Sequence, residues 1–255
     1  MQIDVERAKK VKSILVTLPR PENEKSPYFA LAEKYNLKLD FRAFIHVEGV
    51  LGKDVRKDKI DFADYTAVIF TSKNAVDHFF RVCEEMRFEV SADMKYFCIT
   101  EAIALYLQKY IQYRKRKIFF GKQTAKDLED VLKKHNNEKF LFPCSDVANE
   151  ETQNWLQENG YDSTPVVLFR TVISDLSDLK DVFYDVIVFF SPSSVQSLFE
   201  NFSDFVQNNT RIAAFGATTQ QALLDHNLIL DIPAPTPEAP SMTMAVEQYI
   251  KAVNK

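Results

Sequence analysis

Two short segments of this chain place serine and threonine side chains where an apolar run gives way to a helical one. Residues 70–76 read FTSKNAV and residues 189–195 read FFSPSSV, each after a run of valine and isoleucine. The first N–H groups of a helix lack intrahelical partners and carry the positive end of its dipole. Such turns are suited to bind anions. Two of them predict an anionic ligand held between two similar lobes.

The same hydroxyl groups have a simpler interpretation. Serine and threonine are favoured helix N-caps because their oxygens accept hydrogen bonds from first-turn N–H groups. For any single position the cap is the better interpretation, although a capped turn still exposes N–H groups to a ligand. The ambiguous positions are Thr71, Ser72, Thr124, Ser145, Ser191, Ser193 and Thr218.

The similarity between the two halves of the chain extends beyond these turns. Residues 95–102 resemble 211–218, and residues 15–18 resemble 140–143. Each pair is a short apolar strand before a helix, and the pairs occur in the same order along the chain. Similarity at a nearly fixed separation indicates an internal duplication.

Strands and helices alternate along nearly the whole chain, which predicts an α/β fold with parallel sheets covered by helices on both faces. Two further β-rich segments, 39–50 and 163–174, are predicted to be linker strands. The chain then crosses into a second lobe, 51–162, and returns, so that the first lobe is discontinuous and consists of 1–38 with 175–255. The predicted parallel strands lie near 13–18, 66–70, 95–99, 117–120, 139–142, 186–190, 211–215 and 228–232.

Composition limits the class of protein. With 255 residues, 46% hydrophobic and 27% charged, the chain is typical of a soluble protein of one large or two small domains. The net charge of −4 argues against nucleic acid as the main partner, so an anionic ligand requires local donors. No signal peptide and no membrane-spanning run is recognisable. The three cysteines are expected to be free buried thiols in a reducing cytosol. The four histidines show no metal-ligand spacing, so no metal is expected.

The chain resembles the uroporphyrinogen-III synthase family over essentially its whole length. The order and spacing of several short motifs carry this resemblance, since each motif alone is weak. The motifs are 14–17 with 19–21, 70–76, 169–171, 190–195, 214–219 with 222–223, and 235–238.

The resemblance implies two α/β lobes joined by a two-stranded antiparallel linker, with the active site in the cleft between them. It implies a lyase that converts hydroxymethylbilane, a linear tetrapyrrole, into uroporphyrinogen III with loss of water and inversion of ring D. No cofactor is implied. A cytoplasmic monomer is expected, with no membrane partner, and the upstream enzyme that produces hydroxymethylbilane is a candidate partner. A non-catalytic two-lobed sensor of an anionic small molecule is the alternative. A periplasmic-type solute-binding protein is disfavoured because no signal peptide is recognisable.

The expected substrate-binding residues lie in the turns after the strands, and Arg20, in a proline-flanked loop, is the expected carboxylate clamp. They are Arg20, Thr71, Ser72, Asn74, Ala75, Thr124, Ser145, Ser191, Ser193, Ser194, Gly216 and Thr218. No catalytic residue is assigned. The family commonly has tyrosine where this chain has Phe169, and the resemblance implies that a tyrosine hydroxyl group there can hydrogen-bond the departing hydroxyl group of the substrate. The Phe169 ring carries no donor, so either water or another hydroxyl group takes this task or turnover is slow. Phe169→Tyr is therefore predicted to raise turnover about tenfold, which corresponds to about 1.4 kcal/mol of barrier.

Overall fold

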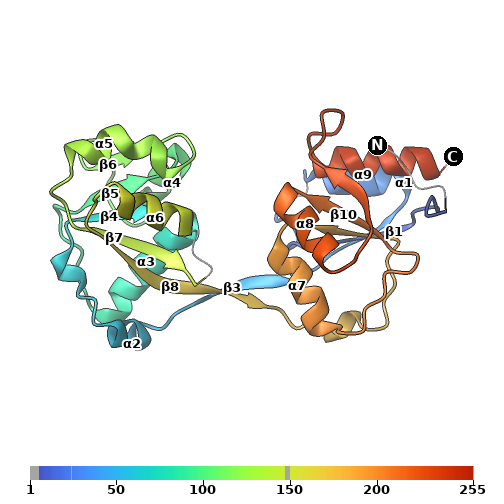
Figure 1. Ribbon diagram of the computed structural model, residues 1–255, viewed down its shortest axis with the longest axis horizontal. Helices are drawn as coiled ribbons and strands as arrows, with labels where there is room; N and C mark the ends of the chain where they lie inside the picture. The colour runs from blue at the N-terminus through green and yellow to red at the C-terminus, as the bar shows by residue number, and fades with distance from the viewer. Residues whose placement is uncertain (1–5, 24, 147–149, 255) are drawn as a thin grey trace. The chain divides into compact units, whose positions relative to one another are not determined.

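The structure is a computed structural model that describes residues 6–23, 25–146 and 150–254. The chain forms two compact units (Figure 1). Unit 1 contains the residues up to His46 and those from Val172 onward, and unit 2 is Val47–Thr171. Unit 1 is therefore discontinuous in sequence.

Unit 1 is a five-stranded parallel sheet with the strand order β11-β10-β9-β1-β2. Its strands are β1 (Ser13–Val16), β2 (Lys38–Phe41), β9 (Val186–Phe189), β10 (Arg211–Phe215) and β11 (Leu230–Ala234). Its helices are α1 (Pro27–Tyr35), α7 (Pro192–Asn201), α8 (Ala217–Asp225) and α9 (Met242–Val253), with a short 3-10 helix at Ser177–Leu179.

Both faces of the unit 1 sheet are apolar because successive side chains of a strand point to opposite faces. In β1, Ile14 and Val16 join the core under α1 and α9, whereas Leu15 joins the core under α7 and α8. Helices therefore cover both faces, as the continuous hydrophobic strands require.

Unit 2 is built in the same way around a sheet with the order β3-β8-β7-β4-β5-β6. Its strands are β3 (Ile45–Gly49), β4 (Ala67–Phe70), β5 (Lys95–Cys98), β6 (Ile118–Phe120), β7 (Phe140–Ser145) and β8 (Ser163–Ile173). Its helices are α2 (Gly52–Val55), α3 (Lys73–Met86), α4 (Glu101–Tyr106), α5 (Glu129–Lys134) and α6 (Glu150–Glu158), with short 3-10 turns that include Ala125–Leu128. Helices α3 and α4 pack on one face, and α5 and α6 on the other.

The two sheets have one topology. When β4, β5 and β7 are matched with β9, β10 and β1, as the sequence similarity requires, β6 matches β11 and β8 matches β2. The order β8-β7-β4-β5-β6 in unit 2 then equals β2-β1-β9-β10-β11 in unit 1. The α/β fold and all eight predicted parallel strands are confirmed.

The predicted linker segment 39–50 differs in the structure. It is two strands rather than one, because Leu39 and Phe41 pack against the apolar core of unit 1 and place β2 in parallel register with β1. Unit 1 thereby gains a fifth strand. Only β3, the second of the two strands, pairs with β8.

Strands β3 and β8 run in opposite directions. At one end Val50 N–H donates to the Leu168 carbonyl (2.9 Å), and at the other Ser174 N–H donates to the Phe44 carbonyl (2.9 Å). Both strands contain a boundary between the units, which falls after His46 in β3 and after Thr171 in β8.

Candidate active site

In unit 2, four neighbouring parallel strands end at the same edge of the sheet, and a hydroxyl group stands at or just after the end of each. Ser145 ends β7, Thr71 follows β4, and Thr124 follows β6 by a short turn. Thr100, between β5 and α4, was not among the predicted site residues, and it caps α4 by accepting from Ile103 N–H (3.3 Å). Ligands of open α/β sheets bind at this edge, near the point where the strand order reverses. In unit 2 the order reverses between β4 and β7.

The turn before α3 is a capped helix start with open donors. Ser72 Oγ accepts from Ala75 N–H (3.0 Å), so Ala75 uses its N–H within the cap. The N–H groups of Lys73 and Asn74 make no hydrogen bond to a described residue, and both residues are exposed. Thr71 is half-buried and takes no part in the cap. This turn can therefore present two N–H groups and one hydroxyl group to an anion.

The structure brings Thr71 and Thr124 together. Both line a small cavity of about 280 Å³ in unit 2 that also includes Lys126 and Trp155. Thr124 itself is engaged locally, because its N–H (2.7 Å) and its hydroxyl group (3.1 Å) both donate to Asp127. Hydrogen bonds from the backbone N–H groups of Thr124 and then Gln123 hold the pKa of Asp127 below its usual range. Lys126 forms a surface ion pair with Glu151 of α6 (3.1 Å), and the negative charge of Glu151 weakens the attraction of Lys126 for an anion.

In unit 1 the turn before α7 is also capped. Ser191 Oγ accepts from Ser194 N–H (3.2 Å), and Ser194 Oγ donates to the Ser191 carbonyl (2.7 Å). Ser194 is buried and fully used inside the turn. Pro192 at the first helical position has no N–H to offer. Ser193 is half-buried, takes no part in the cap and remains the accessible hydroxyl group of this turn.

The turn before α8 is different, because its N-cap is Gly216 and no side chain caps the helix. Gly216 adopts φ 86°, a conformation that disfavours other residues, and its N–H donates to the Ala234 carbonyl (2.7 Å). The N–H groups of residues 217–219 make no hydrogen bond to a described residue. Thr218 is exposed in this first turn, whereas Thr219 is buried. Among the described helix starts with predicted site residues, this one offers the most open donors.

The predicted carboxylate clamp, Arg20, is exposed in the segment after β1. Its guanidinium group lies 5.2 Å from the centre of the Phe29 ring, a cation–π contact that holds it against α1. It forms no ion pair with a described residue, so its charge is available to an anion.

Phe169, the position where the resemblance implies tyrosine, is 7% exposed and belongs to the core of unit 2. Its ring stacks on the imidazole of His78 with centroids 5.1 Å apart and an interplanar angle of 18°. His78 Nδ1 accepts from Arg81 Nε (3.1 Å), and burial, followed by the charge of Arg81, lowers the pKa of His78. Sequence reasoning did not single out His78, and no local sequence pattern marks it.

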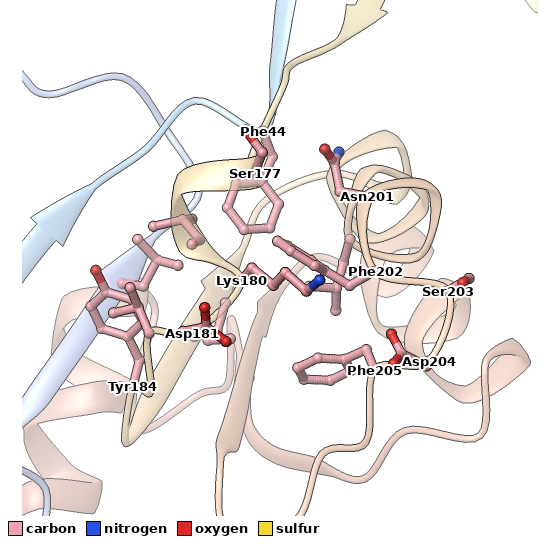
Figure 2. Close-up of a pocket in the computed structure, with 15 residues that line it drawn as sticks. Phe44, Ser177, Lys180, Asp181, Tyr184, Asn201, Phe202, Ser203, Asp204 and Phe205 are labelled. Atoms are coloured by element: carbon pink, nitrogen blue, oxygen red, sulfur yellow. The ribbon is translucent and has the colours of Figure 1, made fainter.

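A larger cavity of about 590 Å³ lies in unit 1, and none of the predicted site residues lines it (Figure 2). Its walls come from the segment before β9 and the segment between α7 and β10, with the aromatic rings of Phe44, Tyr184, Phe202 and Phe205. Lys180 extends into it toward Phe202. These segments lead into the amino ends of β9 and β10, so the cavity is separate from the turns described above.

The remaining features are the cysteines, groups of metal-binding side chains and long apolar helices. The three cysteines are free and buried, as predicted, and burial raises the pKa of Cys83 and Cys98 to about 12 and that of Cys144 to about 11. Across residues 6–23, 25–146 and 150–254, no group of three His, Cys, Asp or Glu side chains is placed to hold a metal ion. No helix of the described chain is long and apolar enough to cross a membrane.

The chain is similar in sequence to proteins of one family. The family described as Uroporphyrinogen-III synthase HemD matches residues 30–244. The chain is 24% identical to a uroporphyrinogen-III synthase of Chlorobaculum parvum, over 94% of this chain and 100% of that protein. It is 26% identical to that of Saccharomyces cerevisiae over 48% of this chain and 50% of the relative.

Solved structures show the same fold. The uroporphyrinogen-III synthetase of Helicobacter pylori matches with a TM-score of 0.61 at 17% identity, covering 94% of this chain and 99% of that one. A mutant uroporphyrinogen III synthase from Thermus thermophilus matches with a TM-score of 0.54 at 15% identity, covering 95% and 99%. The family match spans most of the chain, and this chain therefore belongs to the uroporphyrinogen-III synthase family.

Proposed function

We propose that this protein is a lyase that closes hydroxymethylbilane to uroporphyrinogen III with loss of water and inversion of ring D. The observation that carries the proposal, beside family membership, is the set of open N–H groups at the starts of α3 and α8. Each lies directly after the carboxyl end of a parallel strand, where α/β sheets bind ligands.

These donors suit the substrate. Hydroxymethylbilane carries acetate and propionate carboxylates around its rim, and helix N-terminal N–H groups bind carboxylates through hydrogen bonds and the helix dipole. A chain with net charge −4 has no general positive field to attract them, so local donors must bind this ligand. We propose that Lys73 and Asn74 in unit 2, and Ser193 and Thr218 in unit 1, share the carboxylates, with Arg20 as an additional clamp.

Binding of this kind also accounts for the selectivity of the reaction. Loss of the hydroxyl group leaves a cationic azafulvene, which closes unaided to the type I isomer. An enzyme that holds the chain in one conformation brings the substituted carbon of ring D to the electrophile, and such positioning can supply most of the required rate difference. Because several turns contribute donors, the tetrapyrrole is held at many points on its rim.

We further propose a cytoplasmic protein, with a small-molecule substrate and no nucleic-acid partner, that receives hydroxymethylbilane from the upstream enzyme. The substrate closes to the wrong isomer when free, so rapid transfer between the two enzymes preserves it.

The test is a direct assay of the isomer formed. Purified protein is mixed with hydroxymethylbilane without added metal or cofactor, and the type I and type III products are separated after oxidation. We expect type III product in proportion to enzyme. Product that stays type I at high protein concentration, together with retained binding of the tetrapyrrole, would instead support the non-catalytic sensor.

A further inference from the structure

Three side chains on one face of α3 contact the segment that follows β3 and the strand β8. Arg81 donates to the carbonyl groups of Val50 (2.7 Å) and Leu168 (3.2 Å). Glu85, one turn further, accepts from Gly52 N–H (2.6 Å). His78, one turn before Arg81, stacks on the residue after Leu168. This face of α3 therefore fixes the position of β8 where it carries Phe169.

The contact with Arg81 sets the tautomer of His78. A guanidinium group has donors only, so the Nδ1 that receives the Arg81 Nε–H bears no proton. Burial and the positive charge of Arg81 both lower the pKa of His78, which keeps the ring neutral at pH 7. The single ring proton is then on Nε2. Among the described residues Nε2 has no hydrogen-bond partner, and His78 is half-buried rather than fully buried, so this N–H is free to bind a ligand.

His78 lies close to the proposed anion site at the start of α3. It lies on α3 six residues after the cap Ser72, which is about 9 Å along a helix axis at 1.5 Å per residue. That distance is about the size of two linked pyrrole rings. A tetrapyrrole whose carboxylate binds at the start of α3 can therefore place a substituent at His78.

We propose that the Nε2–H of His78 donates a hydrogen bond to the departing hydroxyl group of hydroxymethylbilane. The inference rests on the function proposed above and adds a catalytic residue to it. The His78 imidazole stacks directly on Phe169, whose own ring has no donor, and the stack keeps the N–H beside it. Arg81 acts as a positioning residue, since it holds the tautomer and the backbone of β8.

Loss of the hydroxyl group uses only a proton from solvent and releases water. The bond between the methylene carbon and the hydroxyl oxygen breaks, and its electron pair stays on oxygen. The adjacent pyrrole nitrogen supplies its lone pair to form the azafulvene cation. The oxygen leaves as water after taking a proton from solvent. His78 keeps its proton throughout and stabilises the negative charge that develops on the oxygen, as a fixed neutral donor can do.

The experiment compares three variants with the native protein in the isomer assay. His78→Phe keeps an aromatic ring against Phe169 but removes the donor, and His78→Gln keeps an N–H donor but removes the ring. The matched control is His226→Phe in unit 1, where an imidazole stacks on Phe199 with centroids 4.2 Å apart. Thermal unfolding of each variant is measured in parallel.

We expect kcat of His78→Phe to fall roughly 10- to 100-fold. This loss is smaller than the usual loss for a donor in a water-excluded site, because His78 is only half-buried. KM should stay within about threefold, because the carboxylate contacts are untouched. His78→Gln should retain most of the activity, and His226→Phe should match the native protein.

Native kcat in folded His78→Phe excludes a catalytic donor at this position. Equal loss in the Phe and Gln variants with a lowered unfolding midpoint shows that His78 acts only through packing. The native protein is assayed first, and if it makes no type III product the proposed function fails instead. Nitrogen chemical shifts of His78 then still test its tautomer, and a protonated Nδ1 contradicts a hydrogen bond donated by Arg81 Nε to that atom.

Discussion

Removing the hydroxyl group of Thr218 separates ligand binding from helix capping. Thr218 is exposed in the first turn of α8, where Gly216 is the N-cap and no side chain caps the helix. Thr218→Ala therefore removes no hydrogen bond that a described residue makes. Alanine also has the higher helix propensity, by at most about 0.7 kcal/mol. We expect the free energy of unfolding to stay unchanged or to rise slightly.

The expected effect on activity is much larger. A hydrogen bond from a neutral hydroxyl group to a substrate carboxylate contributes about 1–2 kcal/mol when its loss leaves the charge less well solvated. If Thr218 makes that bond, kcat/KM should fall about 5- to 30-fold, because each 1.4 kcal/mol is a factor of ten. The backbone N–H groups of the same turn remain, so activity should not be abolished.

The assay measures kcat/KM for type III product and the thermal midpoint of the same samples. Gln221→Ala is the matched control, because it truncates an exposed side chain one turn later on the same helix. It should leave kcat/KM unchanged, and loss of its exposed hydrogen bond to Asp225 (2.8 Å) should cost no more than about 0.5 kcal/mol of stability. If Thr218→Ala lowers the thermal midpoint by several degrees while activity per folded molecule holds, Thr218 acts as a cap and does not contact the substrate.

Three further predictions concern stability. Ser72→Ala removes the cap of α3 and should cost about 1 kcal/mol in a denaturant titration; an unchanged midpoint would show that the cap is dispensable. Tyr28→Phe removes a buried hydroxyl group that has no hydrogen-bond partner in the described part of the chain and should be neutral or stabilising by up to about 1 kcal/mol, so a clear destabilisation would reveal a further partner such as a water. Hydrogen bonds from Lys34 and then Lys251 lower the pKa of Glu247 to about 2. Because the unfolded value is about 4.3, the stabilisation from Glu247 is complete above that pH and is lost as pH falls toward 2. Glu247→Gln should therefore lower the thermal midpoint at pH 7 but not near pH 2, and equal shifts at both pH values would contradict this.

Much of the fold follows from local sequence patterns. The eight parallel strands are short, apolar on both faces and followed by helices, so their periodicity marks them without tertiary information. Strand β2 was not predicted as part of a sheet, because the alternation of Leu39 and Phe41 with polar residues is typical of an exposed strand. Its place is decided by contact with the core of unit 1, which no local pattern contains.

The candidate site was predictable by residue type but not by role. Serine and threonine after a strand indicate a helix start, and Ser72 and Ser191 are indeed caps. Which hydroxyl groups remain open depends on backbone geometry, such as the positive φ of Gly216. The partner of Phe169 could not be predicted either, because His78 lies on α3, far from β8 in sequence, and only the packing of α3 on β8 brings the two rings together.

The two units share one strand order, yet their helix starts have diverged. In unit 2, Thr100 follows β5 and caps α4, a helix of six residues. In unit 1, Gly216 occupies the corresponding place after β10, and α8, with nine residues, begins without a side-chain cap. A cap satisfies one of the N–H groups that an anion would otherwise use. The uncapped and longer helix is therefore the better anion site of this pair. This is why the first turn of α8 is the place where a hydroxyl group can be removed to test ligand contact without a cost in stability.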